Sequence, residues 1–224
     1  MNQYKKQIIE VKINNTIAAL AKNNMNGIYA PDCQAVVEEV KKLLSDGCTV
    51  SMGGCATAAE TGILDLLRSG RYNFLDRNVP GLTGEQIMDI YRKTFCADAF
   101  ITSANAVTEN GELYNVDGNS NRVSAMLFGP DKVIVIAGYN KIVSDIDDAI
   151  KRVKTTAAPI NAARLGCDTP CTKTGKCVSL SKQNPHLCDG CASDARICAN
   201  YTVMARQRRN DRVYVILVGE ELGF

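Results

Sequence analysis

Histidine is nearly absent from this sequence, and its scarcity removes several kinds of catalysis. The 224 residues contain one histidine, His186. We therefore do not expect a Ser-His-Asp or Cys-His catalytic centre in the body of the chain. The sequence also lacks an HExxH helix and any histidine cluster that would indicate a catalytic zinc ion. Acid–base chemistry must come from carboxylates, lysine or cysteine.

Long apolar runs and a large net charge are also missing. No apolar run approaches the roughly 18 residues of a membrane span, and the N-terminal stretch MNQYKKQIIEVKINNTIAALAKN lacks the apolar core of a signal peptide. The net charge of +2 gives no general attraction to nucleic acids or membranes, so we expect neither as a partner. These absences favour a cytoplasmic protein.

Short apolar runs alternate with segments of helical periodicity. The pattern predicts strands at 26–30, 48–54, 72–76, 97–107, 112–116, 131–138 and 211–224, and helices at 2–22, 31–44, 56–68, 83–95, 121–129 and 144–156. Strands that alternate with helices indicate βαβ units. We therefore predict an α/β fold, a mainly parallel sheet with helices on both faces, in a single domain over 1–224. A cysteine-rich, metal-binding loop occupies 158–200 within that domain.

Two consecutive glycines stand where a predicted strand turns into a predicted helix. In SMGGCATAAE, Gly53 and Gly54 precede Cys55, with Thr57 and Glu60 on the first helical turns. Free backbone N–H groups at such a turn suit a phosphate or carboxylate. The Rossmann spacing of glycines and the P-loop lysine are both absent, so neither a dinucleotide nor a nucleoside triphosphate is specifically indicated. The alternative is a purely structural turn with a buried cysteine.

Polar residues also follow three other predicted strands. Ligands bind at the carboxyl ends of strands in open α/β sheets, so these residues are candidate ligand contacts. Glu109, held by the tight turn Asn110-Gly111, is a candidate nucleophile or general base; a solvated glutamate before a hairpin is the alternative. The other candidates for binding an anionic small molecule are Asn105, Asn121, Arg122, Asn140 and Lys141.

The stretch ADAFITSANAVTENGELYNVDGNSNRVSAMLFGPDKVIVIAGYNKIV resembles the LUD domain family, named for lactate utilisation proteins. The resemblance implies a fold related to ribose-5-phosphate isomerase, glucosamine-6-phosphate deaminase and CoA transferases. It also implies a role in oxidation of lactate or similar hydroxy acids within an iron–sulfur enzyme system. TENGEL is similar to the active-site stretch of class I CoA transferases, which places the attacking carboxylate on Glu109, and MGG resembles their CoA-binding glycine loop.

Cysteine is distributed unevenly. Six of the ten cysteines lie between Cys167 and Cys198. Clustered cysteines in a reducing compartment indicate metal or redox chemistry more often than disulfides. Cys188 and Cys191 form a C-x-x-C pair, which suits one metal. We predict Cys171, Cys188, Cys191 and Cys198 as ligands of a 4Fe–4S cluster or a zinc ion, with Cys177 and Cys167 in reserve. Reduced cysteines packed in a loop are the alternative.

Three functions remain open from the sequence. The first is a redox-linked subunit or enzyme in hydroxy-acid oxidation, which binds an anionic carboxylate, phosphate or CoA-type molecule near Gly53–Thr57. The second is a CoA-transferase or isomerase-like enzyme that uses Glu109. The third is a non-catalytic module that docks to an iron–sulfur partner subunit.

Overall fold

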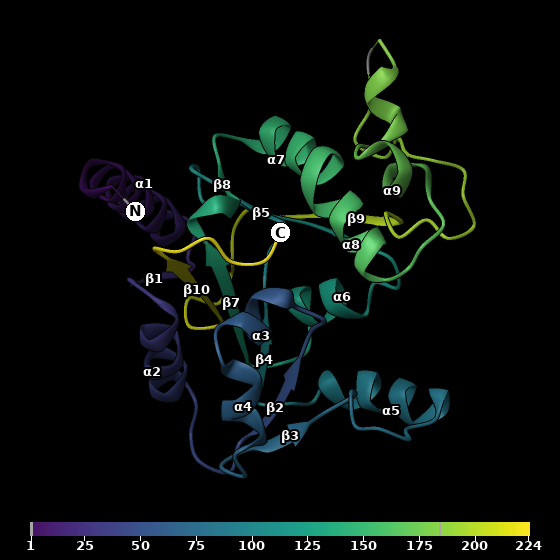
Figure 1. Ribbon diagram of the computed structural model, residues 1–224. Helices are drawn as coiled ribbons and strands as arrows, with labels where there is room; N and C mark the ends of the chain where they lie inside the picture. The colour runs from purple at the N-terminus through teal and green to yellow at the C-terminus, as the bar shows by residue number, and fades with distance from the viewer. Residues whose placement is uncertain (1, 184) are drawn as a thin grey trace.

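A computed structural model describes residues 2–183 and 185–224 (Figure 1). The α-helices are α1 (Gln3–Lys22), α2 (Cys33–Leu43), α3 (Ala56–Glu60), α4 (Ile63–Arg68), α5 (Gly84–Thr94), α6 (Asn121–Leu127), α7 (Ile146–Arg152), α8 (Ala158–Arg164) and α9 (Pro170–Thr174). The strands are β1 (Asn26–Ala30), β2 (Thr49–Met52), β3 (Asn73–Leu75), β4 (Ala99–Thr102), β5 (Ala106–Thr108), β6 (Leu113–Asp117), β7 (Lys132–Gly138), β8 (Ile142–Val143), β9 (Asn200–Met204) and β10 (Val213–Val218). Short 3₁₀ turns η1 (Tyr139–Lys141) and η3 (Val178–Ser181) and a π-helical turn η2 (Val153–Ala157) complete the elements. No helix among the described residues combines the length and apolarity needed to cross a membrane.

The larger sheet has six strands in the order β1-β10-β7-β4-β2-β3, and all of its pairings are parallel. Alternate residues of its central strands point to two separate cores. Val133 and Val135 of β7 pack with α1 and α6, whereas Ile134 and Ile136 pack with α2, α3 and α4. The predicted α/β fold, with helices on both faces of a mainly parallel sheet, is therefore confirmed. The unbroken apolar run of β7 reflects burial on both sides.

A second sheet, which the sequence pattern did not predict, has the order β8-β5-β6-β9. It shares Val107 and Leu113 with the core under α1, and its other face, with Ala106 and Tyr114, is covered by α7, η2 and α8. The predicted single strand over 97–107 is wrong. The chain leaves the large sheet after β4, crosses over at Ser103–Asn105, and enters the second sheet as β5.

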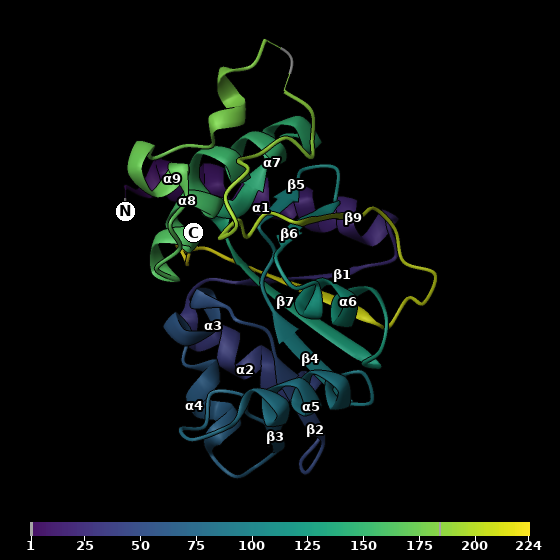
Figure 2. The same cartoon turned by 90° about the vertical axis from the view of Figure 1, so that its right-hand side faces the viewer.

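Two other predictions need correction. The predicted helix 56–68 is broken into α3 and α4, because Gly62 has a φ of +75° that an α-helix does not accommodate. The predicted loop 158–200 contains helices α8 and α9, and α8 continues α7 through the π-helical turn η2. In both views, α9 and the segment after it lie at the opposite end of the molecule from α4, β3 and α5 (Figures 1 and 2).

Candidate functional site

A cavity of about 400 Å³ opens where the carboxyl ends of β2 and β4 meet α6, α8 and the second sheet. Seven of the sequence-predicted binding residues line it, and they come from four separate segments. They are Gly54, Cys55, Thr57, Asn105, Asn121, Arg122 and Lys141. A volume of this size is typical of small-molecule sites.

Close packing requires glycine at both positions of the bend after β2, Gly53 and Gly54. A Cβ at Gly53 would come within 2.9 Å of Thr102 Oγ1 and 3.3 Å of Arg122 Cδ. A Cβ at Gly54 would come within 2.5 Å of Arg77 Nη2. The two glycines therefore let two arginines, Arg122 and Arg77, approach the backbone closely. The helix that follows, α3, has only five residues, so these side chains rather than its dipole supply the positive charge.

Lys141 is a buried cation in the wall of the cavity. Its side chain is 3% exposed, and Nζ donates hydrogen bonds of 2.9 Å to both Thr57 Oγ1 and Ser103 Oγ. An ammonium has three donors, so one is left for a ligand. Burial, together with the positive charges of Arg152 and Arg122, lowers the pKa of Lys141 to about 8, against an opposite effect of Cys55 and Glu60.

Arg122 holds the strand ends together. Its guanidinium donates to Ser103 O at 3.0 Å, Asn115 Oδ1 at 2.7 Å, Asn105 Oδ1 at 3.0 Å and Val116 O at 2.9 Å. These bonds join the crossover after β4 to the neighbouring strand β6. Burial lowers the pKa of Arg122, yet an arginine stays charged under all physiological conditions. Arg122 therefore gives the cavity a fixed positive charge whose four terminal N–H donors are already used.

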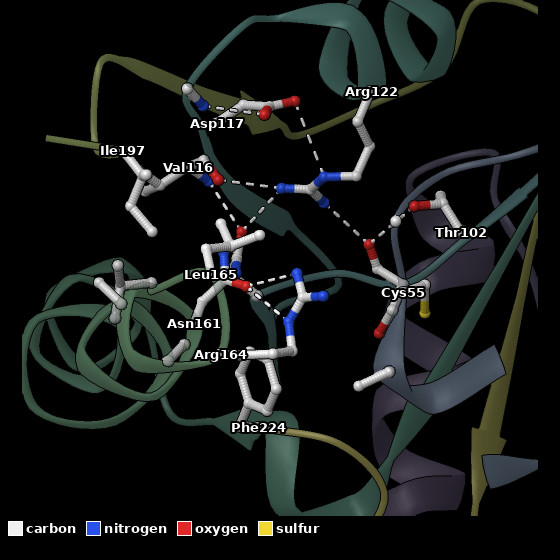
Figure 3. Close-up of a pocket in the computed structure, with 18 of the residues that line it drawn as sticks. Cys55, Thr102, Val116, Asp117, Arg122, Asn161, Arg164, Leu165, Ile197 and Phe224 are labelled. Atoms are coloured by element: carbon white, nitrogen blue, oxygen red, sulfur yellow. Dashed lines mark hydrogen bonds and ion pairs between the residues drawn. The ribbon is translucent and has the colours of Figure 1, made fainter. Parts of the chain in front are cut away.

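Two further arginines keep donors for a ligand. Arg77 donates to Tyr91 Oη and stacks on that ring at 5.3 Å, while its buried Nε lacks a hydrogen-bond partner among the described residues. Arg164 bonds Asn161 Oδ1 through Nε and Nη2 only. Figure 3 shows the Arg164 guanidinium beside the Phe224 ring and facing the same cavity as Arg122.

The charges around the cavity do not balance. Five cationic side chains line it, Arg77, Arg122, Lys141, Arg164 and Arg196. Asp117, which pairs with Arg122 at 3.8 Å, is the one acidic side chain among the described lining residues. Val116, Leu165, Ile197 and Phe224 form an apolar part of the wall. The site therefore suits an anionic group attached to a less polar body.

Gly53, Glu60 and Asn140 lie near the cavity but do not line it. Glu60 accepts a 2.7 Å hydrogen bond from the backbone N–H of Gly223, and Asn140 Oδ1 accepts one of 3.1 Å from the backbone N–H of Leu222. Both side chains thus hold the C-terminal segment in place, and this segment carries Phe224 to the cavity wall.

Glu109 lies apart from the cavity. Its side chain is 42% exposed and pairs with Lys12 of α1 at 3.0 Å, and it is not among the lining residues. The predicted tight turn is present, and Gly111 has a φ of +82° and packs against the backbone of Ala19 and Leu20. The structure therefore does not bring Glu109 together with the glycine bend, and its predicted chemical role remains a prediction.

The cysteine-rich segment forms a second, smaller cavity. Of the predicted ligands, Cys171, Cys191 and Cys198 line it, Cys188 does not, and Cys177 completes a group of four. Burial, with the neighbouring thiols of Cys177, Cys171 and Cys191, raises the pKa of Cys198 to about 11. All ten cysteines are free thiols, and within the described residues no three His, Cys, Asp or Glu side chains are arranged to hold a metal ion.

Sequence reasoning missed three of the five cationic lining residues. Arg77 follows β3, so the same strand-end argument that selected Arg122 and Lys141 would have found it. Arg164 lies on α8 and Arg196 lies between Cys191 and Cys198, both in the segment predicted as loop. For these two, nothing in the local pattern indicated which way the side chain points.

The fold and the site together define an α/β protein with a cationic cavity at the carboxyl edge of a parallel sheet. The chain belongs to the LUD domain family, whose family model matches residues 13–218. Among solved structures, a DUF162 family protein from Deinococcus radiodurans is similar over 95% of this chain and 98% of its own, with 13% identity and a TM-score of 0.48. The β subunit of eIF2B from Chaetomium thermophilum is similar over 50% of this chain and 43% of its own, with 16% identity and a TM-score of 0.34. No curated protein matches this chain in sequence.

Proposed function

We propose that this LUD domain binds an anionic small molecule, a carboxylate or phosphate compound, in the cationic cavity. The observation that carries the proposal is the charge of the lining side chains, five cationic against one acidic. Arg77, Arg164 and Lys141 are the direct contacts, because each keeps at least one N–H donor outside the protein's own hydrogen bonds. Charge-assisted hydrogen bonds of this kind are about twice as strong as neutral ones.

The family resemblance indicates the chemical class of the ligand, and the cavity volume indicates its size. A role in hydroxy-acid oxidation implies a 2-hydroxycarboxylate of the lactate type, whose carboxylate suits a guanidinium pair. A cavity of about 400 Å³ also has room for more than a three-carbon acid. The apolar wall of Leu165, Ile197 and Phe224 supports either a longer acyl chain or a second reactant beside the acid.

Calorimetric titration of the full chain with inorganic phosphate, L-lactate and CoA, each separately, tests this proposal. We expect at least one of the three to bind, and Arg77→Met to weaken that binding tenfold or more, since a charged hydrogen bond contributes about 1.5–3 kcal/mol. Arg71→Met is the matched control, because Arg71 is an exposed arginine paired with Asp46 outside the cavity. Equal loss of affinity in both variants, or no binding of any of the three, contradicts the proposal.

A further inference from the structure

The second cavity is lined by four cysteines that come from different parts of the cysteine-rich segment. Cys171 lies on α9, Cys177 precedes η3, Cys191 is in the following loop and Cys198 comes just before β9. The rest of its wall is largely apolar, with Val153, Ala158, Ala162 and Val178 among the lining residues. Four thiols therefore line one largely apolar space, and no disulfide joins them.

Arg196, which lines this cavity, holds the loop that carries two of these cysteines. The guanidinium of Arg196 donates to the carbonyl oxygens of Cys198 at 2.8 Å, Cys191 at 3.2 Å and Cys188 at 2.8 Å. Gly190 makes this possible, because a Cβ there would lie 2.6 Å from Arg196 Cζ. One arginine therefore fixes the loop that carries two of the four thiols.

The other side of the cavity is fixed by the π-helical turn η2. The backbone N–H of Cys177 donates to Lys154 O at 2.9 Å, and Lys154, which is 5% exposed, donates through Nζ to His186 O at 2.8 Å. Single π-helical turns inside α-helices occur frequently at functional sites. Here the turn anchors both the segment that carries Cys177 and the loop beyond it.

We propose that Cys171, Cys177, Cys191 and Cys198 bind an iron–sulfur cluster of the 4Fe–4S type. Four thiolates are the ligand set of such a cluster, and each thiol releases its proton to solvent as its sulfur–iron bond forms. The cavity is lined by four thiols, which matches the number that a 4Fe–4S cluster takes. A single zinc ion also takes four sulfurs, and the metal content of the protein distinguishes the two.

The proposed cluster lies directly behind one wall of the cationic cavity. Val153, Ala158, Arg196, Ile197 and Cys198 line both cavities. A cluster held by Cys198 would therefore neighbour the anion that we propose for the first cavity. The cluster proposal does not depend on that anion, because the cysteine cavity has its own lining and its own scaffold.

Anaerobic reconstitution of the full chain with ferrous iron and sulfide tests the proposal. We expect about four iron and about four sulfide ions per chain, with broad visible absorption that dithionite bleaches. Serine at Cys171, Cys177, Cys191 or Cys198 should remove most of the iron and the colour. Cys188→Ser and Cys96→Ser are the controls and should retain both, because these thiols are exposed and do not line the cavity.

Three results would overturn the cluster site. They are a colourless protein after reconstitution, one equivalent of zinc in the isolated protein that the same four variants lose, and loss of iron in Cys188→Ser with retention in Cys177→Ser. Far-ultraviolet circular dichroism shows whether each variant is folded, and a double variant Cys177→Ser/Cys191→Ala repeats the test where one serine disturbs packing. Because iron content is measured without any added anion, a failure to bind the cluster can be distinguished from a failure to bind the anion.

Discussion

The guanidinium of Arg77 lies against the Cα of Gly54, so closely that a Cβ at Gly54 would come within 2.5 Å of Nη2. This contact explains why the bend after β2 carries a glycine at its second position. It also joins two residues 23 positions apart, which follow the neighbouring parallel strands β2 and β3, into one wall of the cavity. The bend and the arginine therefore act as a unit.

Gly54→Ala tests this unit. The added methyl group must shift the end of the Arg77 side chain, so we expect the affinity for the bound anion to fall roughly tenfold, about 1.4 kcal/mol, while the fold persists. Gly84→Ala is the control, since a Cβ at Gly84 meets open space at the start of α5. Titration calorimetry of both variants measures the difference, and unchanged affinity in Gly54→Ala would count against the role of Arg77.

Lys141 makes anion binding depend on pH. Burial lowers the pKa of Lys141 to about 8, so the ammonium is protonated below that pH and increasingly neutral above it. We expect the affinity for sulfate, whose own charge is constant in this range, to fall as the pH rises from 7 to 9. Lys141→Met should weaken binding at pH 7 and flatten the profile. A profile of the same slope in Lys141→Met would assign the titration to another group.

Arg122 is expected to matter for stability more than for contact with the ligand. Arg122→Met removes the hydrogen bonds to Ser103 O, Val116 O and the amide oxygens of Asn105 and Asn115, although each amide oxygen keeps a second bond from a backbone N–H. A hydrogen bond to a charged group contributes about 1.5–3 kcal/mol. We expect urea denaturation to show a free energy of unfolding lower by about 3 kcal/mol or more.

Arg209→Met is the comparison for that measurement. Arg209 pairs with Asp131 at 3.2 Å, and both side chains are largely exposed. Exposed ion pairs contribute less than about 1 kcal/mol. A loss in Arg122→Met no larger than in Arg209→Met would show that the hydrogen bonds of Arg122 do not hold the strand ends.

Glu109→Gln separates the two enzyme hypotheses. Glu109 is half-exposed, pairs with Lys12 and does not line the cavity. We expect the variant to keep its anion affinity and to lose less than about 1 kcal/mol of stability. Loss of anion binding in Glu109→Gln would favour the transferase-like hypothesis, in which this carboxylate reacts with the ligand.

The sequence predicted the large sheet well because its strands carry their own signal. The apolar runs of β7 and β10 and the capping box formed by Thr83 and Gln86 at the start of α5 are local patterns. The second sheet was not predictable in this way. Its strands are short, β8 has two residues, and β9 follows the cysteine-rich segment without an apolar alternation that stands out.

The site residues differ in the same way in how far the sequence could predict them. Lys141 follows β7 and was found because the carboxyl ends of parallel strands share one edge. Arg122 follows β6, whose pairings are antiparallel, so that rule does not account for its place in the cavity. The positions of Arg164, Arg196 and Cys177 depend on how α8 and the cysteine-rich segment fold back over the second sheet. Such long-range contacts produce no periodic pattern in the sequence. Spacing alone therefore selected Cys188, which forms a C-x-x-C pair with Cys191, whereas Cys177 is the residue that lines the second cavity.

A crystal of the full chain grown with selenate, with data collected at the selenium absorption edge, tests the cationic cavity most directly. Selenate is a tetrahedral dianion, and its anomalous signal distinguishes it from water. We predict one ordered selenate in the cavity, with oxygens in hydrogen-bond contact with Arg77, Arg164 or Lys141. Selenate bound only elsewhere on the surface, with this cavity free of anomalous signal, would contradict the account.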